Sequence, residues 1–326
     1  MKLIIPMAGK GTRLKPHTHT TPKALVHVAG KPLIGHVLDN LSRIKFDKAI
    51  FIVDEDNAEL RELIEKEYPF EAVYIQQKER KGISHAIKGA RRHADNDEVV
   101  IIFADTLAEG DFNIIKNHKT DGIIWTKQVT DPSKFGVVFE HDGFISQLIE
   151  KPENPISDLA MIGMYYFKNS TKLFDAIEYI IKNDIKTKGE YQITDAIQVM
   201  INNGAKLIAS NVKVWQDSGT IPNIIDTNRY LLEKNKQKVI ATTDSVIKKP
   251  VFIEKGARVI GSIIGPNVSI GKDAVINKSI ISDSIINKNA TVENAVLKDC
   301  VIGKNTKVKG SSNKLNIGDS SEIYYS

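Results

Sequence analysis

The first 25 residues, MKLIIPMAGKGTRLKPHTHTTPKAL (1–25), join a short apolar run to a segment rich in glycine, cations and hydroxyl groups. Residues 2–6 (KLIIP) are typical of a buried strand, because a short β-branched run is bounded there by polar residues, Gly or Pro. The segment from Gly9 to Lys23 then follows as a loop at the carboxyl end of that strand. Ligands of parallel sheets bind at this edge, so the loop is a candidate ligand site.

Strand-like and helical patterns alternate through the rest of the first 235 residues. In residues 31–44 (KPLIGHVLDNLSRI) the apolar side chains recur at the spacing of one helical face. The alternation predicts a Rossmann-like α/β fold, with a mostly parallel sheet and helices on both faces. The expected strands are 2–6, 48–53, 71–75, 98–103, 135–140 and 163–167, and the expected helices are 31–44, 58–67, 82–93, 171–182, 194–202 and 222–235.

The pattern changes after about residue 245. Helical periodicity stops, and aliphatic residues recur with Gly or Asn directly behind them, as in Ile264-Gly265, Ile270-Gly271 and Ile276-Asn277, six residues apart. A six-residue period of this kind is typical of a parallel β-helix, in which each short strand buries an aliphatic side chain. We expect two domains, residues 1–240 and 241–326, the second a β-helix of roughly four coils with about 18 residues each. A generic antiparallel β domain is the alternative.

Length and composition narrow the class of protein. At 326 residues, with 41% apolar and 26% charged residues, the chain fits a globular protein of two domains. No stretch approaches the roughly 18 apolar residues of a membrane span, and the start is too short for a secretory signal, so a cytoplasmic location is expected. The net charge of +5 without long like-charge runs argues against a nucleic-acid surface. The single cysteine, Cys300, is expected to be a small buried hydrophobe.

The loop from Gly9 to Lys23 has a composition that suits phosphate. Leu14 occupies the third glycine place of the dinucleotide fingerprint, and the GxxxxGK[ST] pattern fails too. Backbone amides beside glycine can nevertheless approach phosphate oxygens, with Arg13 and Lys23 supplying positive charge. From these residues alone, an ordinary solvated turn is an equal alternative. His17 and His19 suggest a metal only weakly, since no third ligand is implied, and a polar loop is the preferred interpretation.

The same loop meets a family signature. It stands as GKGTRLKPHTHTTPKAL (9–25) and matches every fixed position of GxGTRLxPxTxxxPKxL, so the chain resembles the sugar-phosphate nucleotidyltransferases. The helix and solenoid at the end resemble the long-form glucose-1-phosphate thymidylyltransferases, which carry a C-terminal left-handed β-helix. Further motifs of the family follow in order over essentially the whole chain: Gln77 before Gly82, Asp105 ending VVIIFAD, DPSKFGVV (131–138), IEKPENP (149–155), GEYQITDAI (189–197) and VWQDSGT (214–220).

The resemblance implies roles for individual residues. Arg13 and Lys23 would grip the nucleotide phosphates and Lys151 the sugar phosphate, so these cations are the expected catalytic residues. Asp105 and Asp217 would hold a magnesium ion, which prefers oxygen ligands. The expected substrate-binding residues are Gly9, Gly11, Thr12, Gln77, Gly82, Gly136, Glu150 and Glu190, with Tyr191 beside Glu190 and Gln76 as a competing choice for Gln77.

The implied reaction joins a nucleoside triphosphate, dTTP or UTP favoured, to a sugar 1-phosphate, glucose 1-phosphate favoured, and releases pyrophosphate. The attacking phosphate oxygen is already ionised near neutral pH, so the enzyme mainly positions the reactants and neutralises charge. Ala104-Asp105-Thr106 and Gly82-Ile83-Ser84 replace the family's usual Gly-Asp-Asn and Gly-Leu-Ala, which leaves base and sugar open. A mannose-1-phosphate guanylyltransferase and a glucose-1-phosphate uridylyltransferase are the alternatives within the class.

Two other classes of function compete with this interpretation. A bifunctional acyltransferase normally uses a histidine base, yet all eight histidines lie at or before His141, so the solenoid has none. A non-catalytic nucleotide-sugar sensor is disfavoured because the charged residues named above are all retained. The solenoid is therefore expected to be an oligomerisation or regulatory element, and the chain a homo-oligomer without nucleic-acid or membrane partners.

Overall fold

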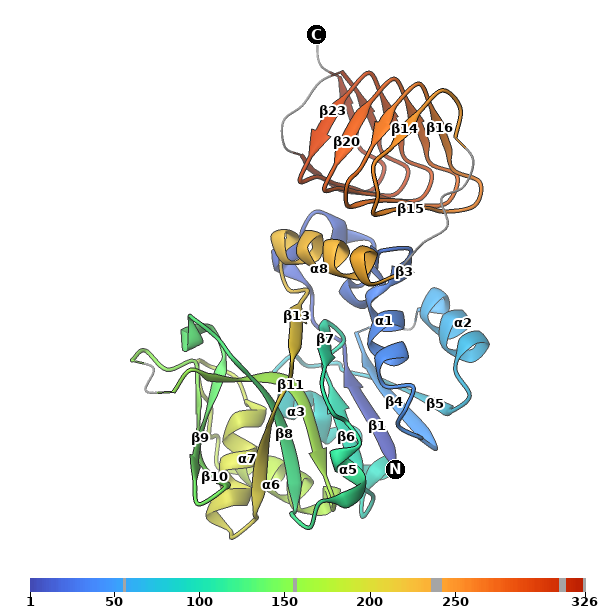
Figure 1. The fold of residues 1–326 in the computed structure, drawn as a ribbon. Helices are drawn as coiled ribbons and strands as arrows, with labels where there is room; N and C mark the ends of the chain where they lie inside the picture. The colour runs from blue at the N-terminus through green and yellow to red at the C-terminus, as the bar shows by residue number, and fades with distance from the viewer. Residues whose placement is uncertain (55–56, 155–156, 236–241, 311–314, 325–326) are drawn as a thin grey trace. The chain divides into compact units, whose positions relative to one another are not determined.

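The computed structural model describes residues 1–54, 57–154, 157–235, 242–310 and 315–324 (Figure 1). The chain divides into two compact units: unit 1 comprises Met1–Gly9 and Val37–Trp215, and unit 2 comprises Lys10–His36 and Gln216–Ser326. The predicted boundary between residues 240 and 241 falls outside the described residues, as does Pro155 of the IEKPENP motif. Within the described ranges, no helix is long and apolar enough to cross a membrane.

Unit 1 is built on a nine-stranded mixed sheet. Its strands are β1 (Lys2–Pro6), β4 (Lys48–Val53), β5 (Glu71–Gln76), β6 (Val99–Ile102), β8 (Gly122–Gln128), β9 (Gly136–His141), β10 (Phe144–Glu150), β11 (Leu159–Phe167) and β12 (Leu207–Asn211). The order is β10-β9-β11-β6-β1-β4-β5, and β8 joins β11 to β12. β6, β1, β4 and β5 run parallel, whereas β11 pairs antiparallel with β6. The parallel part is the expected α/β framework.

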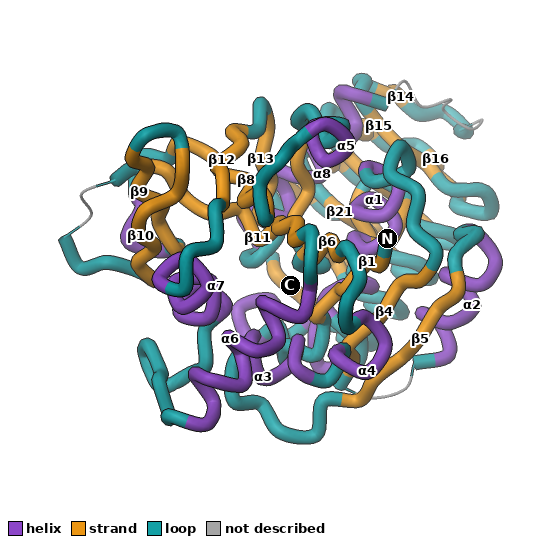
Figure 2. Tube along the Cα trace, turned by 90° about the horizontal axis from the view of Figure 1, so that it is seen from below, coloured by secondary structure: helices purple, strands orange, loops and turns teal. Residues whose placement is uncertain are grey.

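Helices cover both faces of this sheet (Figure 2). α3 (Ile83–Lys88), α4 (Arg91–Ala94), α6 (Ser170–Lys182) and α7 (Ile193–Asn202) line one face, and α5 (Ile114–Asn117) lies on the other. Successive side chains of β11 point to opposite faces of the sheet, as in any strand, and so pack against the helices on either side. Tyr165 joins the core with Phe174 of α6, whereas the Tyr166 ring meets His118, just after α5, edge-on at 4.8 Å between centroids.

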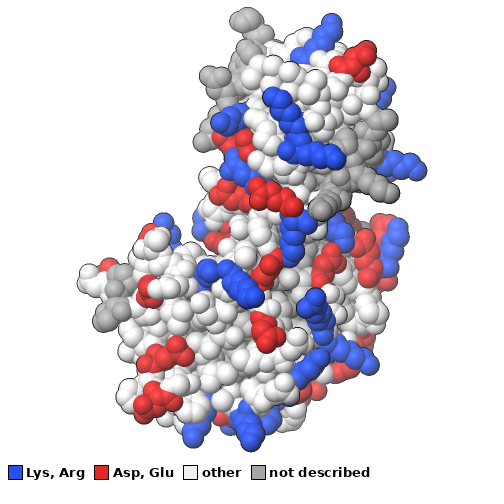
Figure 3. Space-filling model, viewed as in Figure 1, with Lys and Arg blue, Asp and Glu red and all other residues white. Residues whose placement is uncertain are grey.

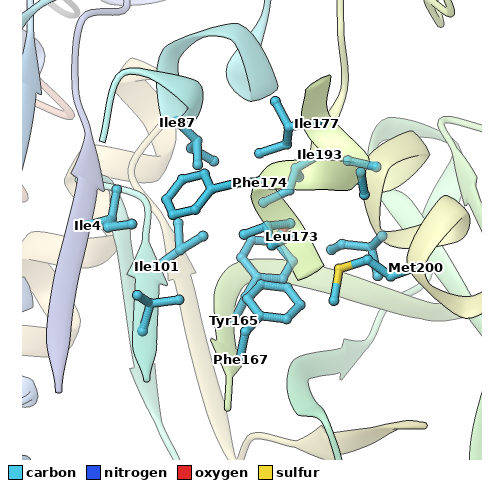
Figure 4. Close-up of a cluster of buried hydrophobic side chains, with 14 of the residues drawn as sticks. Ile4, Ile87, Ile101, Tyr165, Phe167, Leu173, Phe174, Ile177, Ile193 and Met200 are labelled. Carbon is cyan, nitrogen blue, oxygen red and sulfur yellow. The ribbon is translucent and has the colours of Figure 1, made fainter. Parts of the chain in front are cut away.

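The main core of unit 1 lies between the sheet and α3, α6 and α7. Ile4 of β1, Ile101 of β6 and Phe167 of β11 are completely buried there. Figure 4 shows Phe174 and Leu173 of α6 among these strand residues, with Met200 of α7 close by. Burying one such side chain stabilises the fold by roughly 1.5–3 kcal/mol. This layer therefore contributes much of the stability of unit 1.

Some predicted elements of the first part differ from the structure. The single helix expected over 82–93 is two helices, α3 and α4, because the chain turns at Gly89 and Ala90. The helix expected over 31–44 is the shorter α1 (Leu33–Asn40), since β3 (Lys31–Pro32) pairs with β2 (His27–Val28) instead. α2 (Ala58–Glu67) matches its expected range. The sequence pattern predicts no strand at five places where the structure has one: β7 (Thr106–Glu109), β8, β10, β12 and β13 (Val214–Asp217).

Unit 2 contains the parallel β-helix, formed by three sheets (Figure 1). Every strand pair described in the β-helix is parallel, which excludes the antiparallel alternative. Aliphatic residues stack from coil to coil in its core, as Ile264, Ile281 and Leu297 do. Cys300 is completely buried among them, as predicted.

The strands of the β-helix are short and fall into three columns. One sheet contains β14 (Val246–Ile247), β17 (Ile263–Ile264), β20 (Ile280–Ser282) and β23 (Val296–Lys298). A second contains β15 (Val251–Ile253), β18 (Val268–Ile270), β21 (Ile285–Ile286), β24 (Val301–Ile302) and β26 (Asn316–Ile317). The third contains β16 (Arg258–Ile260), β19 (Val275–Asn277), β22 (Thr291–Glu293), β25 (Lys307–Lys309) and β27 (Glu322–Tyr324).

Single residues in the left-handed conformation turn the corners of the β-helix. Asn267, Asp283 and Asp299 do so at one corner, with φ of 61°, 45° and 54°. Asn and Asp adopt this conformation more readily than other side chains. Such tight corners make the repeat shorter than the expected 18 residues: these three corner residues follow one another at intervals of 16. The three sheets hold four, five and five strands, close to the expected number of coils.

A helix, α8 (Ile221–Lys234), packs on the β-helix within unit 2. At the start of α8, the Thr220 hydroxyl accepts from the backbone N–H of Asn223, and Pro222 is compatible with the first turn of the helix. Asn228, completely buried, accepts from the Ser269 hydroxyl at 2.6 Å and donates to Asn267 O at 3.1 Å.

Figure 3 shows basic and acidic side chains interspersed over the face in view, in keeping with the small net charge.

Candidate active site

Two predicted site residues of unit 1 lie at the carboxyl edge of the parallel strands. Asp105 follows shortly after β6, and Gln77 directly follows β5. The backbone N–H of Gln77 donates to Val53 O at 2.8 Å, which extends the β4–β5 ladder by one bond. The Gln77 side chain is half-buried, with Nε2 donating to Glu79 O at 3.0 Å, whereas Gln76 is exposed. Asp105 and Gln77 therefore stand at the edge where such sheets bind ligands.

The turn that bears Asp105 is anchored on β11. The Phe103 N–H donates to Gly163 O at 3.0 Å, and the buried Thr106 hydroxyl donates to Ile162 O at 2.8 Å. Gly163 has a φ of 81°, and a Cβ atom there would lie 2.5 Å from the Phe103 ring. Glycine is required at this position because both the backbone angle and the close approach exclude a side chain. Asp105 thus sits half-buried on a rigid turn.

Gly82 lies against the segment that holds Glu190 and Tyr191. Its φ is 112°, and a Cβ atom would come within 2.6 Å of the backbone N and O of Tyr191. The Tyr191 N–H donates to Lys81 O at 2.9 Å, and the Ser84 N–H donates to Tyr191 O at 3.0 Å. The structure therefore brings together three of the residues that the sequence assigns to substrate binding.

Glu150, Gly136 and Thr194 form a second cluster. Glu150 ends β10 opposite Gly136 at the start of β9, and the Thr194 hydroxyl donates to Glu150 Oε2 at 2.6 Å. A Cβ atom at residue 136 would lie 3.0 Å from Glu150 Oε2, 3.2 Å from Thr194 Oγ1 and closer still to Met161 Cε. Glycine is therefore needed at residue 136, because Met161, Glu150 and Thr194 leave no room there for a Cβ atom. Sequence reasoning missed Thr194, although it lies in the GEYQITDAI motif and could have been found as the hydroxyl at the start of α7.

Lys151 adopts a backbone conformation that is unusual for a lysine. Its φ is 45°, which costs roughly 1–2 kcal/mol for a residue with a side chain. The Lys151 N–H donates to Phe135 O at 3.0 Å, and its exposed Nζ lies 3.4 Å from Glu150 Oε1. Strained residues of this kind concentrate at functional sites. Lys151 and Glu150 thus lie within ion-pair distance of each other.

Asp195 is a further carboxylate that the sequence analysis did not single out. Its Oδ1 accepts from the Thr187 hydroxyl at 3.0 Å, and its Oδ2 is buried without a hydrogen-bond partner among the described residues. Burial raises the pKa of Asp195, and the negative charge of Glu150 adds to this effect. The environment of Glu150 therefore includes a second acidic group that protonates more readily than usual.

In unit 2, the loop residues from Lys10 to Lys23 are compact despite their composition. They form short 3-10 turns at Thr12–Leu14, His17–His19 and Lys23–Leu25, with Leu14 and Leu25 completely buried. Gly11 has a φ of 58°, and a Cβ atom there would lie 2.9 Å from Thr18 Cγ2 and 3.2 Å from Lys23 Cβ. The loop therefore closes on itself, while Gly9, Thr12 and Arg13 stay exposed.

Arg13 and Asp217 meet at a buried glycine. A Cβ atom at Gly219 would lie 3.3 Å from Arg13 Nη2 and 3.0 Å from Asp217 Oδ1. The neighbouring Ser218 is completely buried and shares a hydrogen bond of 3.0 Å with Thr227 of α8, which fixes the turn. A cation predicted to bind phosphate and a carboxylate predicted to bind magnesium are therefore adjacent within unit 2.

His17 is buried within the loop from Lys10 to Lys23 and contacts the β-helix. Only 5% of its surface is exposed, and its Nε2 lies 2.5 Å from Asn316 Oδ1 of the β-helix. His19 is exposed. Within the described ranges, no group of three or more His, Cys, Asp or Glu residues is arranged to hold a metal ion. The contact between His17 and Asn316 spans 299 residues, which no local pattern can show.

These features define a class of protein: a sugar nucleotidyltransferase with a parallel β-helix appended. Residues 2–234 match the family model described as nucleotidyl transferase, and residues 229–319 match the model described as GlmU-like, C-terminal hexapeptide. The chain belongs to the nucleotidyl transferase family. The hexapeptide match agrees with the β-helix, so the expected fold class is confirmed.

Named relatives share most of the chain. A glucose-1-phosphate thymidylyltransferase from Streptomyces antibioticus is 32% identical over 86% of this chain and 81% of its own length. A bifunctional sugar-1-phosphate nucleotidylyltransferase/acetyltransferase from Sulfurisphaera tokodaii is 33% identical over 78% of this chain and 65% of its own length. A Bacillus anthracis protein assigned as a glucose-1-phosphate thymidylyltransferase, crystallised with sucrose, superposes with a TM-score of 0.63 at 27% identity, over 73% of this chain and 98% of that one.

Proposed function

We propose that this sugar-1-phosphate nucleotidyltransferase couples dTTP or UTP to glucose 1-phosphate. The observation with most weight is the pair of Glu150 and Lys151, in which a carboxylate oriented by the Thr194 hydroxyl lies 3.4 Å from the Lys151 Nζ and so places a hydroxyl acceptor beside a phosphate-binding cation. The thymidylyltransferase name of the Streptomyces antibioticus relative supports the choice of nucleotide and sugar. Guanylyl transfer to mannose 1-phosphate is the competing specificity, and within the proposal uridylyl transfer to glucose 1-phosphate is the alternative to thymidylyl transfer.

In the proposed reaction, a phosphate oxygen of the sugar 1-phosphate attacks the α-phosphorus of the triphosphate in line. The bond from that phosphorus to the oxygen bridging to the β-phosphate breaks, so the products are a nucleoside diphosphate sugar and pyrophosphate. Arg13 and Lys23 neutralise the nucleotide phosphates, Lys151 the sugar phosphate, and Glu150 accepts from sugar hydroxyls. Gly9, Gly11 and Thr12 offer backbone approach to phosphate, and Gln77 reads the base beside Gly82.

We propose Asp105 and Asp217 as ligands of a magnesium ion. Their carboxylates supply oxygen donors, which this ion prefers, and few protein ligands suffice because it usually keeps water and binds substrate phosphates. When bound, the ion would withdraw negative charge from the phosphate oxygens. Asp105 is presented on the rigid turn after β6, and Asp217 beside Arg13 and Gly219. Both positions suit the donor chemistry.

The proposed specificity is tested with a matrix of five nucleoside triphosphates against several sugar 1-phosphates, read by pyrophosphate release. We expect the highest kcat/KM for dTTP or UTP with glucose 1-phosphate. A preference for GTP with mannose 1-phosphate would replace this assignment by the guanylyl alternative. A complete lack of pyrophosphate release, with nucleotide binding intact, would favour the sensor function. Consumption of acetyl-CoA with an aminosugar phosphate would show the acyltransferase function, for which the histidine-free β-helix offers no usual base.

A further inference from the structure

The loop that bears Arg13 and Lys23 is hydrogen-bonded to the last coil of the β-helix, and both belong to unit 2. His17 Nε2 lies 2.5 Å from Asn316 Oδ1, and Asn316 Nδ2 donates to Lys15 O at 3.4 Å. Because an amide oxygen can only accept, the His17 Nε2 holds the hydrogen. Burial lowers the pKa of His17, which favours the neutral imidazole, although the Asn316 hydrogen bond and the Asp319 charge act in the opposite direction. Asn316 therefore holds both a side chain and a backbone group of the loop.

Asp319, three residues after Asn316, makes a second connection to the loop, at Thr20 and Thr21. Its Oδ2 accepts from the Thr20 hydroxyl and, at 3.3 Å, from the buried Thr21 hydroxyl. Its Oδ1 accepts from the Lys304 N–H of the preceding coil at 2.7 Å. One carboxylate thus joins the loop to the backbone of the β-helix. Hydrogen bonds to a charged acceptor are stronger than neutral ones.

Between these two connections, Gly318 of the β-helix packs so closely on Pro16 of the loop that a side chain would not fit. A Cβ atom at Gly318 would lie 2.9 Å from Pro16 Cβ and 3.0 Å from Pro16 Cγ. The loop and the β-helix are therefore closely packed here, in addition to the hydrogen bonds between their side chains. The contact residues of the loop, 15–21, lie between Arg13 and Lys23 in the sequence.

We propose that Asn316 and Asp319 are positioning residues for nucleotidyl transfer, because they hold the loop in the conformation that presents Arg13 and Lys23. The inference rests on the proposed function of that loop. A loop of about fifteen residues that must be ordered on binding loses conformational entropy and hence affinity. The β-helix removes that cost beforehand, since the last coil orders the loop in the absence of nucleotide. The β-helix is thus part of the nucleotide site without contacting the reacting atoms.

The first test compares Asp319→Ala with Glu322→Ala in the full chain. Glu322 is a carboxylate of the same coil that pairs with Lys307 at 2.8 Å inside the β-helix, so its removal is the matched control. We expect Asp319→Ala to raise the KM for the preferred triphosphate about tenfold, with the KM for the sugar phosphate and the melting temperature nearly unchanged. Asp319→Asn, which can still accept from Thr20, should restore part of the loss. Equal effects of Asp319→Ala and Glu322→Ala on the triphosphate KM would overturn the proposal.

A second test does not depend on activity. Amide hydrogen exchange of residues 11–23 is measured without nucleotide, and we expect faster exchange in Asp319→Ala and in Gly318→Ala than in Glu322→Ala. Unchanged exchange in both would overturn the proposal, as would faster exchange with an unchanged triphosphate KM. If the unmodified protein transferred no nucleotidyl group, the proposed function would fail. Faster exchange together with weaker binding of the triphosphate would then still support the positioning role.

Discussion

At the scale of single residues, the proposed magnesium ligands can be separated from the fold. The turn of Asp105 is anchored by Phe103 and Thr106, and the turn of Asp217 by Ser218, so each turn has anchors other than the carboxylate that it carries. We predict that Asp105→Asn and Asp217→Asn each lower kcat about 100-fold or more, a loss typical for removal of one electrostatic stabiliser.

The measurement is pyrophosphate release over a range of magnesium concentrations, with thermal unfolding as the control. Both variants should unfold within about 2 °C of the unmodified protein, because each change preserves side-chain shape. Normal activity in either variant would remove that residue from the metal site.

The hydroxyl of Thr194 orients Glu150, which gives a second prediction at this scale. Thr194→Val keeps the side-chain shape but removes the donor 2.6 Å from Glu150 Oε2, whereas Thr194→Ser keeps it. A lost hydrogen bond to a charged group is worth about 1.5–3 kcal/mol, so the KM for the sugar phosphate should rise about tenfold or more in the valine variant. Initial-rate kinetics with both substrates varied provide the measurement. A serine variant as impaired as the valine variant would show that packing, and not the hydroxyl, is what matters.

At the scale of elements, glycines decide how closely two segments can approach. Gly82 at the start of α3 has a positive φ, and a Cβ atom added there would lie 2.6 Å from the Tyr191 backbone, whereas Gly204, after α7, has a φ of 87° and open space around it. Gly204→Ala therefore measures the backbone strain alone, about 1–2 kcal/mol. Gly82→Ala should cost at least about 1 kcal/mol more, because the segment at Tyr191 must move. Urea unfolding of both variants tests this, and equal losses would contradict it.

The contact between α8 and the β-helix predicts a pH dependence. Although burial acts in the opposite direction, hydrogen bonds from Asn267 and Arg229 lower the pKa of Asp283. A carboxyl group whose pKa is lowered by folding stabilises the fold above its unfolded pKa of about 3.9, and that stability is lost as the pH falls through the folded value. Arg229→Met should therefore reduce stability by about 1 kcal/mol at pH 7, since the pair is partly exposed, and by much less near pH 2.

The comparison is made by urea unfolding of both proteins at several pH values between 2 and 7. Asp226 and Asp299 also pair with Arg229, so the change reports on all three carboxylates together. A loss of stability that stays constant down to pH 2 would show that the methionine merely packs less well than arginine.

At the scale of the whole molecule, the sequence predicted the fold class and the change from an α/β pattern to a β-helix repeat. The first strand, the parallel strands beside it and the repeating aliphatic residues of the β-helix are local patterns, and they appear where expected. The antiparallel pairing of strands such as β9 and β11, and the contacts at Glu150, Gly82 and His17, could not be predicted this way. Each depends on partners far apart in the chain, which propensity and periodicity do not encode. The expected site residues still require the kinetic tests proposed above.

The predicted homo-oligomer can be argued from one face of the β-helix. Val246, Ile263, Ile280 and Val296 stand in register on one sheet, and three of them are 54%, 48% and 48% exposed, namely Val246, Ile280 and Val296. A continuous aliphatic column on a flat sheet is unfavourable in water, and a second copy of the same chain presents a matching column. We therefore predict that the protein associates through this face.

Light scattering after size-exclusion chromatography gives the mass in solution. The unmodified protein should have a multiple of the 36.3 kDa chain mass, and Ile280→Glu should shift it towards a single chain, because the new charges would face each other across the interface. Thr291→Glu introduces the same charge on a different sheet of the β-helix and should leave the mass unchanged. A single-chain mass for the unmodified protein would contradict the oligomer, and an unaltered multiple in Ile280→Glu would place its interface elsewhere.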